Sequence, residues 1–270
     1  MDLLKRDLAP ITPEAWEQID AEAKRVLLMH LAGRKLVDVD GPHGWKHAAV
    51  NVGTLDIKKE SGLGVPWGVR CVIPLIELRQ PFELAMMEID NASRGAVVDL
   101  SVVVKAAEAI AHAEEEAIFN GFKAGGIEGI IPSSPHAAIS IPANYAEYPS
   151  VVVEAAEILR QAGVNGPYAL ALGPQCYNGL AQAAEDGYPI RERLHRIVEG
   201  PIVWAPKIDG AVMLSTRGGD FQLTVGQDLS IGYEAHEKNR VRLYLTESFT
   251  FRVLEHAAAV HLKPQAKGRR

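Results

Sequence analysis

Few residues of this chain stand at spacings that could do chemistry. Glu192 and His195 form one Glu-x-x-His pair, which di-iron carboxylate proteins use in two copies on facing helices, and the sequence has no second copy. His112 and the three glutamates at 114–116 crowd onto one predicted helix, and a single helix cannot close a tight metal site with these side chains. We therefore expect both groups to lie on solvated helix faces, and we predict no metal site.

Catalytic motifs are absent as well. The chain has no Gly-x-Ser-x-Gly, no His-Glu-x-x-His and no Gly-x-x-x-x-Gly-Lys motif, so it gives no positive case for an enzyme and no catalytic residues. A catalytic triad is defined by geometry rather than by spacing, so this absence is weak evidence. The two cysteines, Cys71 and Cys176, lack the paired spacing of a metal site. We interpret both as small core residues of a cytosolic protein.

The composition is that of an ordinary soluble globular protein, since 47% of the 270 residues are hydrophobic and 23% are charged. The net charge of −6 argues against binding nucleic acid through its phosphates, and the basic residues at 263–270 suit a solvated tail. The longest charge-free run, 129–146, contains prolines and a histidine, so it predicts a linker between domains rather than a membrane helix. The first residues lack the apolar core of a signal peptide, and we expect a cytoplasmic protein.

An amphipathic helix is predicted near the N-terminus. Thr12 and Pro13 suit an N-cap and a first helical residue, apolar residues then recur mostly at three- and four-residue spacing, and Gly33 ends the helix. Such a helix either covers the core of its own chain or helps to form a groove for a partner.

A hairpin and a long helix should follow. Residues 50–86 are rich in strand formers, and 58–64 has the composition of the exposed tip of a long hairpin, which would pack on a neighbouring subunit. The longest predicted helix spans 101–123; Gly121 weakens its last turn, and the glycine pair at 125–126 ends it.

After the linker, helices and strands alternate. We predict helices at 150–161, 174–185 and 190–198, and strands at 168–172, 202–205 and 211–215, which suit an α/β layer. The last third predicts a sheet, with strands at 221–225, 229–233 and 240–253 and a turn at 234–239. From Ser248, polar and apolar residues alternate strictly, which is the period of a strand with one buried face.

The sequence at 217–221 is Arg-Gly-Gly-Asp-Phe, and the sequence at 226–233 is Gly-Gln-Asp-Leu-Ser-Ile-Gly-Tyr. Further characteristic segments stand at 4–6, 8–10, 33–35, 37–45, 74–79 and 88–91. Together they resemble the shell protein of family 1 encapsulins, the bacterial nanocompartments once described as linocin-type bacteriocins. The resemblance covers nearly the whole chain, in the order and at the spacing of the family.

The resemblance implies an α+β fold, the phage capsid fold of the Hong Kong 97 type, with a peripheral domain, an axial domain and an extended loop. Residues 1–130 would hold the N-terminal helix, the extended loop (about 50–71) and the first part of the peripheral domain, including the spine helix from Ser101. Residues 131–220 would form the axial domain. Residues 221–270 would return to the peripheral domain and end in the basic tail.

The resemblance also implies a pocket on the inner wall, where a short C-terminal targeting peptide of a cargo protein binds. The matching positions are Leu31, Arg34, Asp38, Leu229, Ile231 and Tyr233. An apolar floor with one acid and one base suits a peptide of aliphatic residues flanked by charge. From the residues alone, the three sheet positions are explained as sheet core, and both interpretations can hold in part. We expect Arg34→Ala to be milder than Ile231→Asp.

Two further implications concern ions and cofactors. Glu185, Asp186, Gly187 and Tyr188 would line a pore at the five-fold axis, where a ring of acidic side chains raises the local concentration of cations. Some members of the family bind a flavin through a tryptophan in the segment that matches 84–90. Met86 and Met87 stand there and offer no indole surface, so we expect no flavin and no other cofactor in the shell.

The implied function is that of a structural shell subunit, which assembles with copies of itself into an icosahedral compartment around a cargo enzyme and has no catalysis of its own. We expect a ferritin-like iron oxidase as cargo, which would handle iron for storage and for protection against oxidative stress; the alternative cargo is a dye-decolorising peroxidase. Two other classes remain, a phage major capsid protein of the same fold and a peptidase or bacteriocin. We expect no nucleic-acid partner and no membrane partner.

Overall fold

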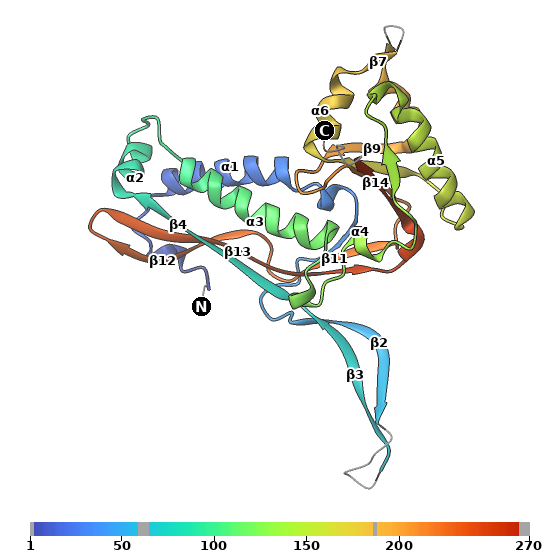
Figure 1. Ribbon diagram of the computed structural model, residues 1–270. Coiled ribbons are helices and arrows are strands. Elements are labelled where there is room, and N and C mark those ends of the chain that lie inside the picture. Colours follow the sequence, from blue (N-terminus) through green and yellow to red (C-terminus); the bar gives the residue numbers. More distant parts are fainter. Residues whose placement is uncertain (1–2, 59–64, 186–187, 265–270) are drawn as a thin grey trace, which may run out of the picture.

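The computed structural model describes residues 3–58, 65–185 and 188–264. Figure 1 shows a long sheet with two helices lying along it, a second unit of strands and helices at one end, and a hairpin that projects away from both. Helices and strands are mixed along the chain, so the predicted α+β class is confirmed.

Strand β13 (Arg240–Val253) organises the first sheet, because three other strands pair with it. Strands β12 (Ser230–Glu237) and β11 (Phe221–Val225) follow one another along one edge, and β4 (Ile76–Ala85) runs along the other edge, all antiparallel to β13. Strand β1 (Asp38–Asp40) adds to β11 in parallel. Segments from the beginning and the end of the sequence therefore meet in one sheet.

The alternation at 248–253 predicted one buried face for β13; Phe249 and Phe251 form it, but burial in this strand is not limited to that face. Thr246, Glu247 and Thr250 are buried together with the apolar residues between them. Two of these side chains have hydrogen-bond partners: the Thr246 hydroxyl donates to the carbonyl of Leu78 at 2.9 Å, and Glu247 accepts from Arg34 at 3.1 Å. The adjoining turn is also shorter than predicted, since β12 continues to Glu237.

Helices α1 (Pro13–His30) and α3 (Ser101–Phe119) lie side by side, and α3 packs on β4 and β13. The predicted N-cap of α1 is confirmed, because the Thr12 hydroxyl accepts from the backbone N–H of Ala15 at 3.3 Å. Helix α3 ends earlier than predicted: Gly121 has a φ of 86°, and a Cβ there would lie 2.8 Å from a backbone nitrogen. The short helix α2 (Met86–Ser93) follows β4 and packs against α1.

The second unit is a five-stranded sheet in the order β5-β14-β10-β6-β9. Its strands are β5 (Ile139–Ile141), β6 (Tyr168–Leu172), β9 (Glu199–Trp204), β10 (Ala211–Ser215) and β14 (Ala259–Pro264). Its helices are α4 (Ile130–Ser133), α5 (Tyr148–Gln161), α6 (Pro174–Gln182) and α7 (Ile190–Val198). The predicted linker at 129–146 therefore contains α4 and β5, and the predicted helix at 174–185 stops at Gln182.

One strand departs from the expected division of the chain. Residues 221–270 were expected to return to the first unit, but β14 pairs with β10 and β5 in the second sheet. Short 3-10 turns complete the chain: η1 (Arg6–Leu8), η2 (Gly33–Lys35), η3 (Lys123–Gly125), η4 (Tyr145–Glu147) and η5 (His256–Ala258). Within the described residues, no helix is long and apolar enough to cross a membrane.

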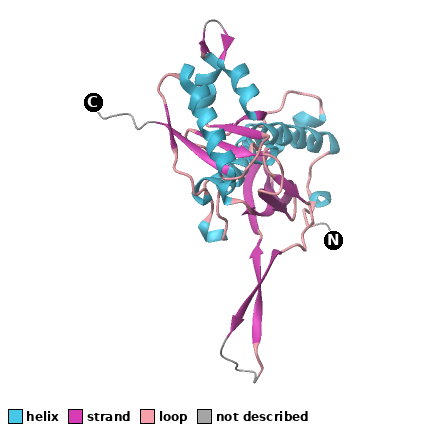
Figure 2. Cartoon of the chain, turned by 90° about the vertical axis from the view of Figure 1, so that its right-hand side faces the viewer, coloured by secondary structure: helices cyan, strands magenta, loops and turns pink. Residues whose placement is uncertain are grey.

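Strands β2 (Ala49–Lys58) and β3 (Trp67–Pro74) form the predicted hairpin, which stands away from the body of the molecule (Figure 2). Most of the predicted tip, 59–64, lies outside the described residues. The side chains of Leu55, Ile57, Trp67, Val69 and Val72 are exposed. Cys71 is on this hairpin and only partly buried, so it is not a core residue as predicted, whereas Cys176 is buried.

Candidate functional site

A groove of about 450 Å³ runs between helix α1 and strand β12. Its floor is apolar, because it exposes part of the core that α1 and α3 share with the first sheet. Four predicted residues meet in this groove: Leu31 at the end of α1, Arg34 in η2, and Leu229 and Ile231 from the sheet. Ile231 is only 4% exposed and Leu31 6%, so both belong to the protein core as well as to the groove.

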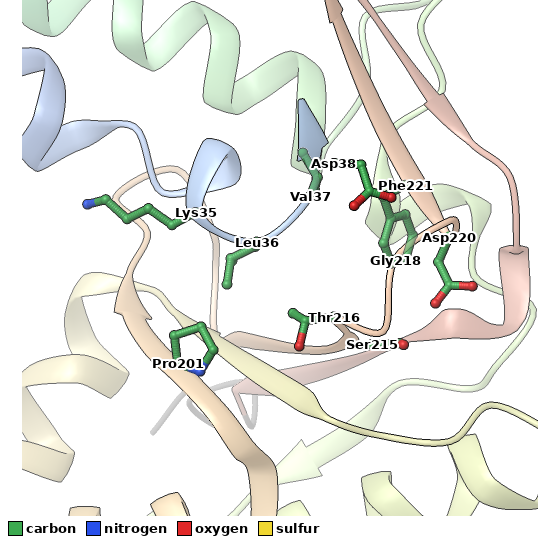
Figure 3. A pocket seen from close by; sticks show the side chains of 10 residues that line it. All are labelled: Lys35, Leu36, Val37, Asp38, Pro201, Ser215, Thr216, Gly218, Asp220 and Phe221. Atoms are coloured by element: carbon green, nitrogen blue, oxygen red, sulfur yellow. The ribbon is translucent and has the colours of Figure 1, made fainter. Parts of the chain in front are cut away.

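Asp38 lies elsewhere. It lines a separate cavity of about 170 Å³ between β1 and the segment that joins β10 to β11, as Figure 3 shows with its neighbours Gly218, Asp220 and Phe221. Its carboxylate accepts a hydrogen bond from the backbone N–H of Gly219 at 2.6 Å. Asp38 thus ties the first sheet to the loop between the two units, and it is not among the residues that line the groove.

Tyr233 is adjacent to the groove and does not line it. Its ring packs against the first core, and its hydroxyl lies 2.5 Å from Nδ1 of His236. Its backbone N–H donates to the carbonyl of Leu4 at 2.8 Å, so the N-terminal segment lies along the free edge of β12. Leu4 itself lines the groove, so Tyr233 helps to hold one groove wall in place.

The structure adds groove residues that the sequence reading missed. Arg6 and Asp20 both line the groove and form a bidentate ion pair at 3.2 and 2.7 Å. The Arg6 guanidinium also lies over the ring of Trp16. Lys24 lies one turn beyond Asp20. The signal was present in the helix, because Asp20, Lys24, Leu28 and Leu31 follow at intervals of three and four residues and share one face.

Behind the groove lies a buried cluster of charges centred on Arg34. Its guanidinium bonds to Glu114 of α3 at 2.6 and 2.9 Å, to Glu247 of β13 at 3.1 Å, and to Asp228 at 2.7 Å. The side chains of Glu114 and Glu247 are fully buried. The expectation that the glutamates of α3 lie on a solvated face is therefore wrong for Glu114 and Glu115, because α3 is covered there by η2 and β13.

Two of the buried carboxyl groups have raised pKa values. Burial raises the pKa of Glu115 to about 8; the charge of Glu114 adds to this, and the hydrogen bond from the backbone N–H of Gly33 at 2.7 Å opposes it. Burial also raises the pKa of Glu247 well above its usual value, as does the neighbouring Glu114. Burial alone would lower the pKa of Arg34, but its bonds to Glu114 raise the pKa instead.

A pair of histidines adjoins the cluster. Nδ1 of His30 lies 3.1 Å from Nε2 of His112, and the ring of Trp204 packs edge-on against His30. Burial lowers the pKa of His112. No group of three or more His, Cys, Asp or Glu side chains within the described residues could hold a metal ion. Glu192 and His195 are exposed on α7, as predicted.

The remaining predicted positions are located as follows. Glu185 and Tyr188 are partners in the two-residue strands β7 (Ala184–Glu185) and β8 (Tyr188–Pro189), at the far tip of the second unit (Figure 1). Asp186 and Gly187 lie outside the described residues. In α2, Met86 packs against the first core and Met87 is 65% exposed. The pore and the absence of a flavin stay predictions.

Comparison with solved structures defines the class of protein. The virus-like particle from Pyrococcus furiosus superimposes with a TM-score of 0.64 at 19% identity, over 92% of this chain and 99% of that chain. The capsid of Myoviridae phage XM1 gives a TM-score of 0.57 at 14% identity, over 84% of this chain and 89% of that chain. At these identities the likeness shows the fold alone, and the fold is the phage capsid fold of the Hong Kong 97 type, as predicted.

The sequence comparisons define the family. Residues 1–250 match the family model described as encapsulating protein for peroxidase. The type 1 encapsulin shell protein of Rhodospirillum rubrum is 47% identical over 97% of both chains, and that of Mycobacterium tuberculosis is 45% identical over 97% of this chain and 99% of its own length. This chain belongs to the family of type 1 encapsulin shell proteins, which confirms the predicted resemblance.

Proposed function

We propose that this chain is the subunit of a closed icosahedral shell that encloses a cargo protein in the bacterial cytoplasm. Its family membership supports this, since its relatives at 45–47% identity are shell proteins. The projecting hairpin supports it as well: Ile57 is 68% exposed and Leu55 53%, and a neighbouring copy would cover this apolar surface. The subunit would be structural, and catalysis would belong to the cargo.

The observation that carries the cargo role is the groove between α1 and β12. Leu31, Leu229 and Ile231 line its apolar floor, Leu28 beside them is exposed to solvent, and charged side chains stand around them. This chemistry suits an extended peptide of aliphatic residues, such as a short C-terminal targeting segment. A single peptide need bind only weakly, because a multimeric cargo that engages several grooves at once is held by effective concentration.

For the cargo we propose a ferritin-like iron oxidase, so that the compartment stores iron. The second candidate is a peroxidase, and the description of the matching family as encapsulating protein for peroxidase favours it. We propose no flavin and no metal ion in the shell itself. The gene that lies next to this one, and a short aliphatic tail on its product, would distinguish the two cargoes.

The groove is tested by co-expression of the shell with the ferritin-like or peroxidase protein of the neighbouring gene, followed by purification of shells and a count of cargo per shell. Ile231→Asp places a carboxylate on the apolar floor and should give intact, empty shells. Because Ile231 is almost fully buried, Leu28→Asp is the companion variant: Leu28 also lines the groove but is 59% exposed. Normal loading of the Leu28→Asp shell would contradict the proposal.

A second test concerns iron. If Glu185 and Asp186 ring a five-fold pore, their charge draws ferrous ions toward it, and salt screens the effect. Asp186→Lys should then slow iron uptake by shells loaded with the iron oxidase, most clearly at low ionic strength. Equal uptake rates in wild-type and variant shells would count against a role of this loop in admitting iron.

A further inference from the structure

The guanidinium group of Arg34 has little capacity left for a ligand. Its Nε bonds to both oxygens of Glu114 at 2.9 Å, Nη2 reaches Glu114 at 2.6 Å and Glu247 at 3.1 Å, and Nη1 reaches Asp228 at 2.7 Å. The side chain is 19% exposed, so it shows only an edge to the groove. An arginine held on each of its three nitrogens cannot turn toward a peptide without leaving buried carboxylates unpaired.

The partners of Arg34 extend into the wall of the groove. Asp228 accepts from Arg34, and the same oxygen accepts from the backbone N–H of Leu229 at 2.9 Å. The hydroxyl of Ser230 then donates to the carbonyl of Asp228 at 2.7 Å. The loop that leads into β12 is thereby fixed to the spine helix α3 through one side chain.

We propose that Arg34 is a positioning residue: together with Glu114 and Glu247 it holds the wall that carries Leu229 and Ile231, and it does not read the charge of the cargo peptide. The inference rests on the proposed function of the groove. Other side chains that line the groove would interact with the charges of the peptide. Arg6 and Asp20 neutralise each other, and Lys24 has no ion pair among the residues that the structure describes.

The first test needs no ligand. Hydrogen exchange is measured on wild-type shells, on Glu114→Gln shells and on Glu22→Gln shells. The Glu22→Gln control breaks an exposed ion pair between Glu22 and Arg25, which both lie on α1. Glu114 is fully buried, cannot touch a peptide and is hydrogen-bonded to Arg34, so its replacement acts on the groove wall from within the buried cluster. We expect amides at 226–231 to exchange on the order of tenfold faster in Glu114→Gln alone, while β6 and β10 stay protected. Unchanged exchange at 226–231 would overturn the proposal.

The second test separates positioning from charge reading. The probe is a fluorescent peptide made from the C-terminal tail of the ferritin-like or peroxidase protein of the neighbouring gene. Three versions are prepared: the native peptide, a neutral peptide in which Gln replaces each charged residue, and a reversed peptide in which each charged residue is replaced by one of opposite charge. Glu114→Gln should weaken binding of all three versions by the same factor, on the order of tenfold. Arg34→Lys should weaken binding as well, because lysine keeps the positive charge but lacks the planar guanidinium group that holds several carboxylates at once.

The matched control is Lys24→Gln, whose effect should change sign between the native and the reversed peptide. A further variant, Arg34→Gln, should weaken binding of the native and the neutral peptide alike. If it weakens binding of the native peptide only, or if Arg34→Lys binds as well as wild type, Arg34 reads charge and the proposal is wrong. If wild-type shells bind none of the peptides, the proposed function of the groove fails. In that case the exchange experiment still decides whether Arg34 fixes the loop at 226–229.

Discussion

At the scale of single residues, the buried cluster behind the groove reverses one expectation. Arg34→Ala was expected to be a mild change at the rim of a pocket. In the structure it would leave the fully buried Glu114 and Glu247 without their counter-charge. Removing one partner of a buried ion pair costs about 3–5 kcal/mol, so we predict that Arg34→Ala lowers the urea midpoint of unfolding severely, as followed by tryptophan fluorescence.

The control for this prediction is Arg25→Ala. Arg25 pairs with Glu22 at 2.7 Å on the exposed surface of α1, where solvent screens the interaction, so its removal should leave the midpoint nearly unchanged. Equal midpoints for Arg34→Ala and Arg25→Ala would show that the cluster contributes little to stability.

Glu115 predicts a dependence of stability on pH. Its pKa is raised to about 8 in the folded chain, against an ordinary value of 4.5, so between these values the folded state holds a proton that the unfolded state releases. Stability therefore falls as the pH rises from about 4.5 to about 8, and is level outside this window. Glu115→Gln keeps an oxygen for the N–H of Gly33 and cannot ionise, so it should flatten this fall and be stabilising at pH 8.

The measurement is the urea midpoint of wild type and Glu115→Gln at pH 5 and at pH 8. The contribution of Glu247, whose pKa is also raised, remains in both proteins and leaves part of the slope. A difference between the two proteins that is the same at both pH values would mean that Glu115 does not titrate in this window.

At the scale of elements, the hairpin of β2 and β3 has no core of its own. Its register places Leu55 and Ile57 on one face and Trp67 and Val69 on the other, so apolar side chains are exposed on both faces. Ile57→Asp should prevent shell closure without unfolding the subunit, because the side chain contacts little within its own chain. Size-exclusion chromatography would show small species, and circular dichroism would show unchanged secondary structure.

Thr54→Asp is the matched control, since it adds the same charge at an exposed polar position of the same strand. It should close into shells far more readily than Ile57→Asp. If Ile57→Asp assembles as wild type does, the hairpin is not contact surface between subunits.

At the scale of the whole molecule, the sequence predicted the elements well and their distant contacts poorly. Helix α7 at 190–198 and strands β6 at 168–172 and β10 at 211–215 have the predicted bounds, because local sequence patterns need no knowledge of the fold. The burial of Glu114 does not follow from local patterns. Its partner Arg34 is 80 residues away in the sequence, and Glu247, which also bonds to Arg34, is 213 residues from Arg34. Asp38 was placed in the groove by the family resemblance, whereas pairing of β1 with β11 carries it to another cavity.

We propose that copies of this chain close into a shell and hold cargo by the groove between α1 and β12. Electron cryo-microscopy of the chain co-expressed with a cargo protein that ends in an aliphatic tail tests both parts of this proposal. We predict closed icosahedral particles with the hairpin of each subunit lying on a neighbour, and extended peptide density against Leu31, Leu229 and Ile231 on the inner wall. Monomers or open oligomers, or closed particles whose peptide density lies away from this groove, would contradict the account.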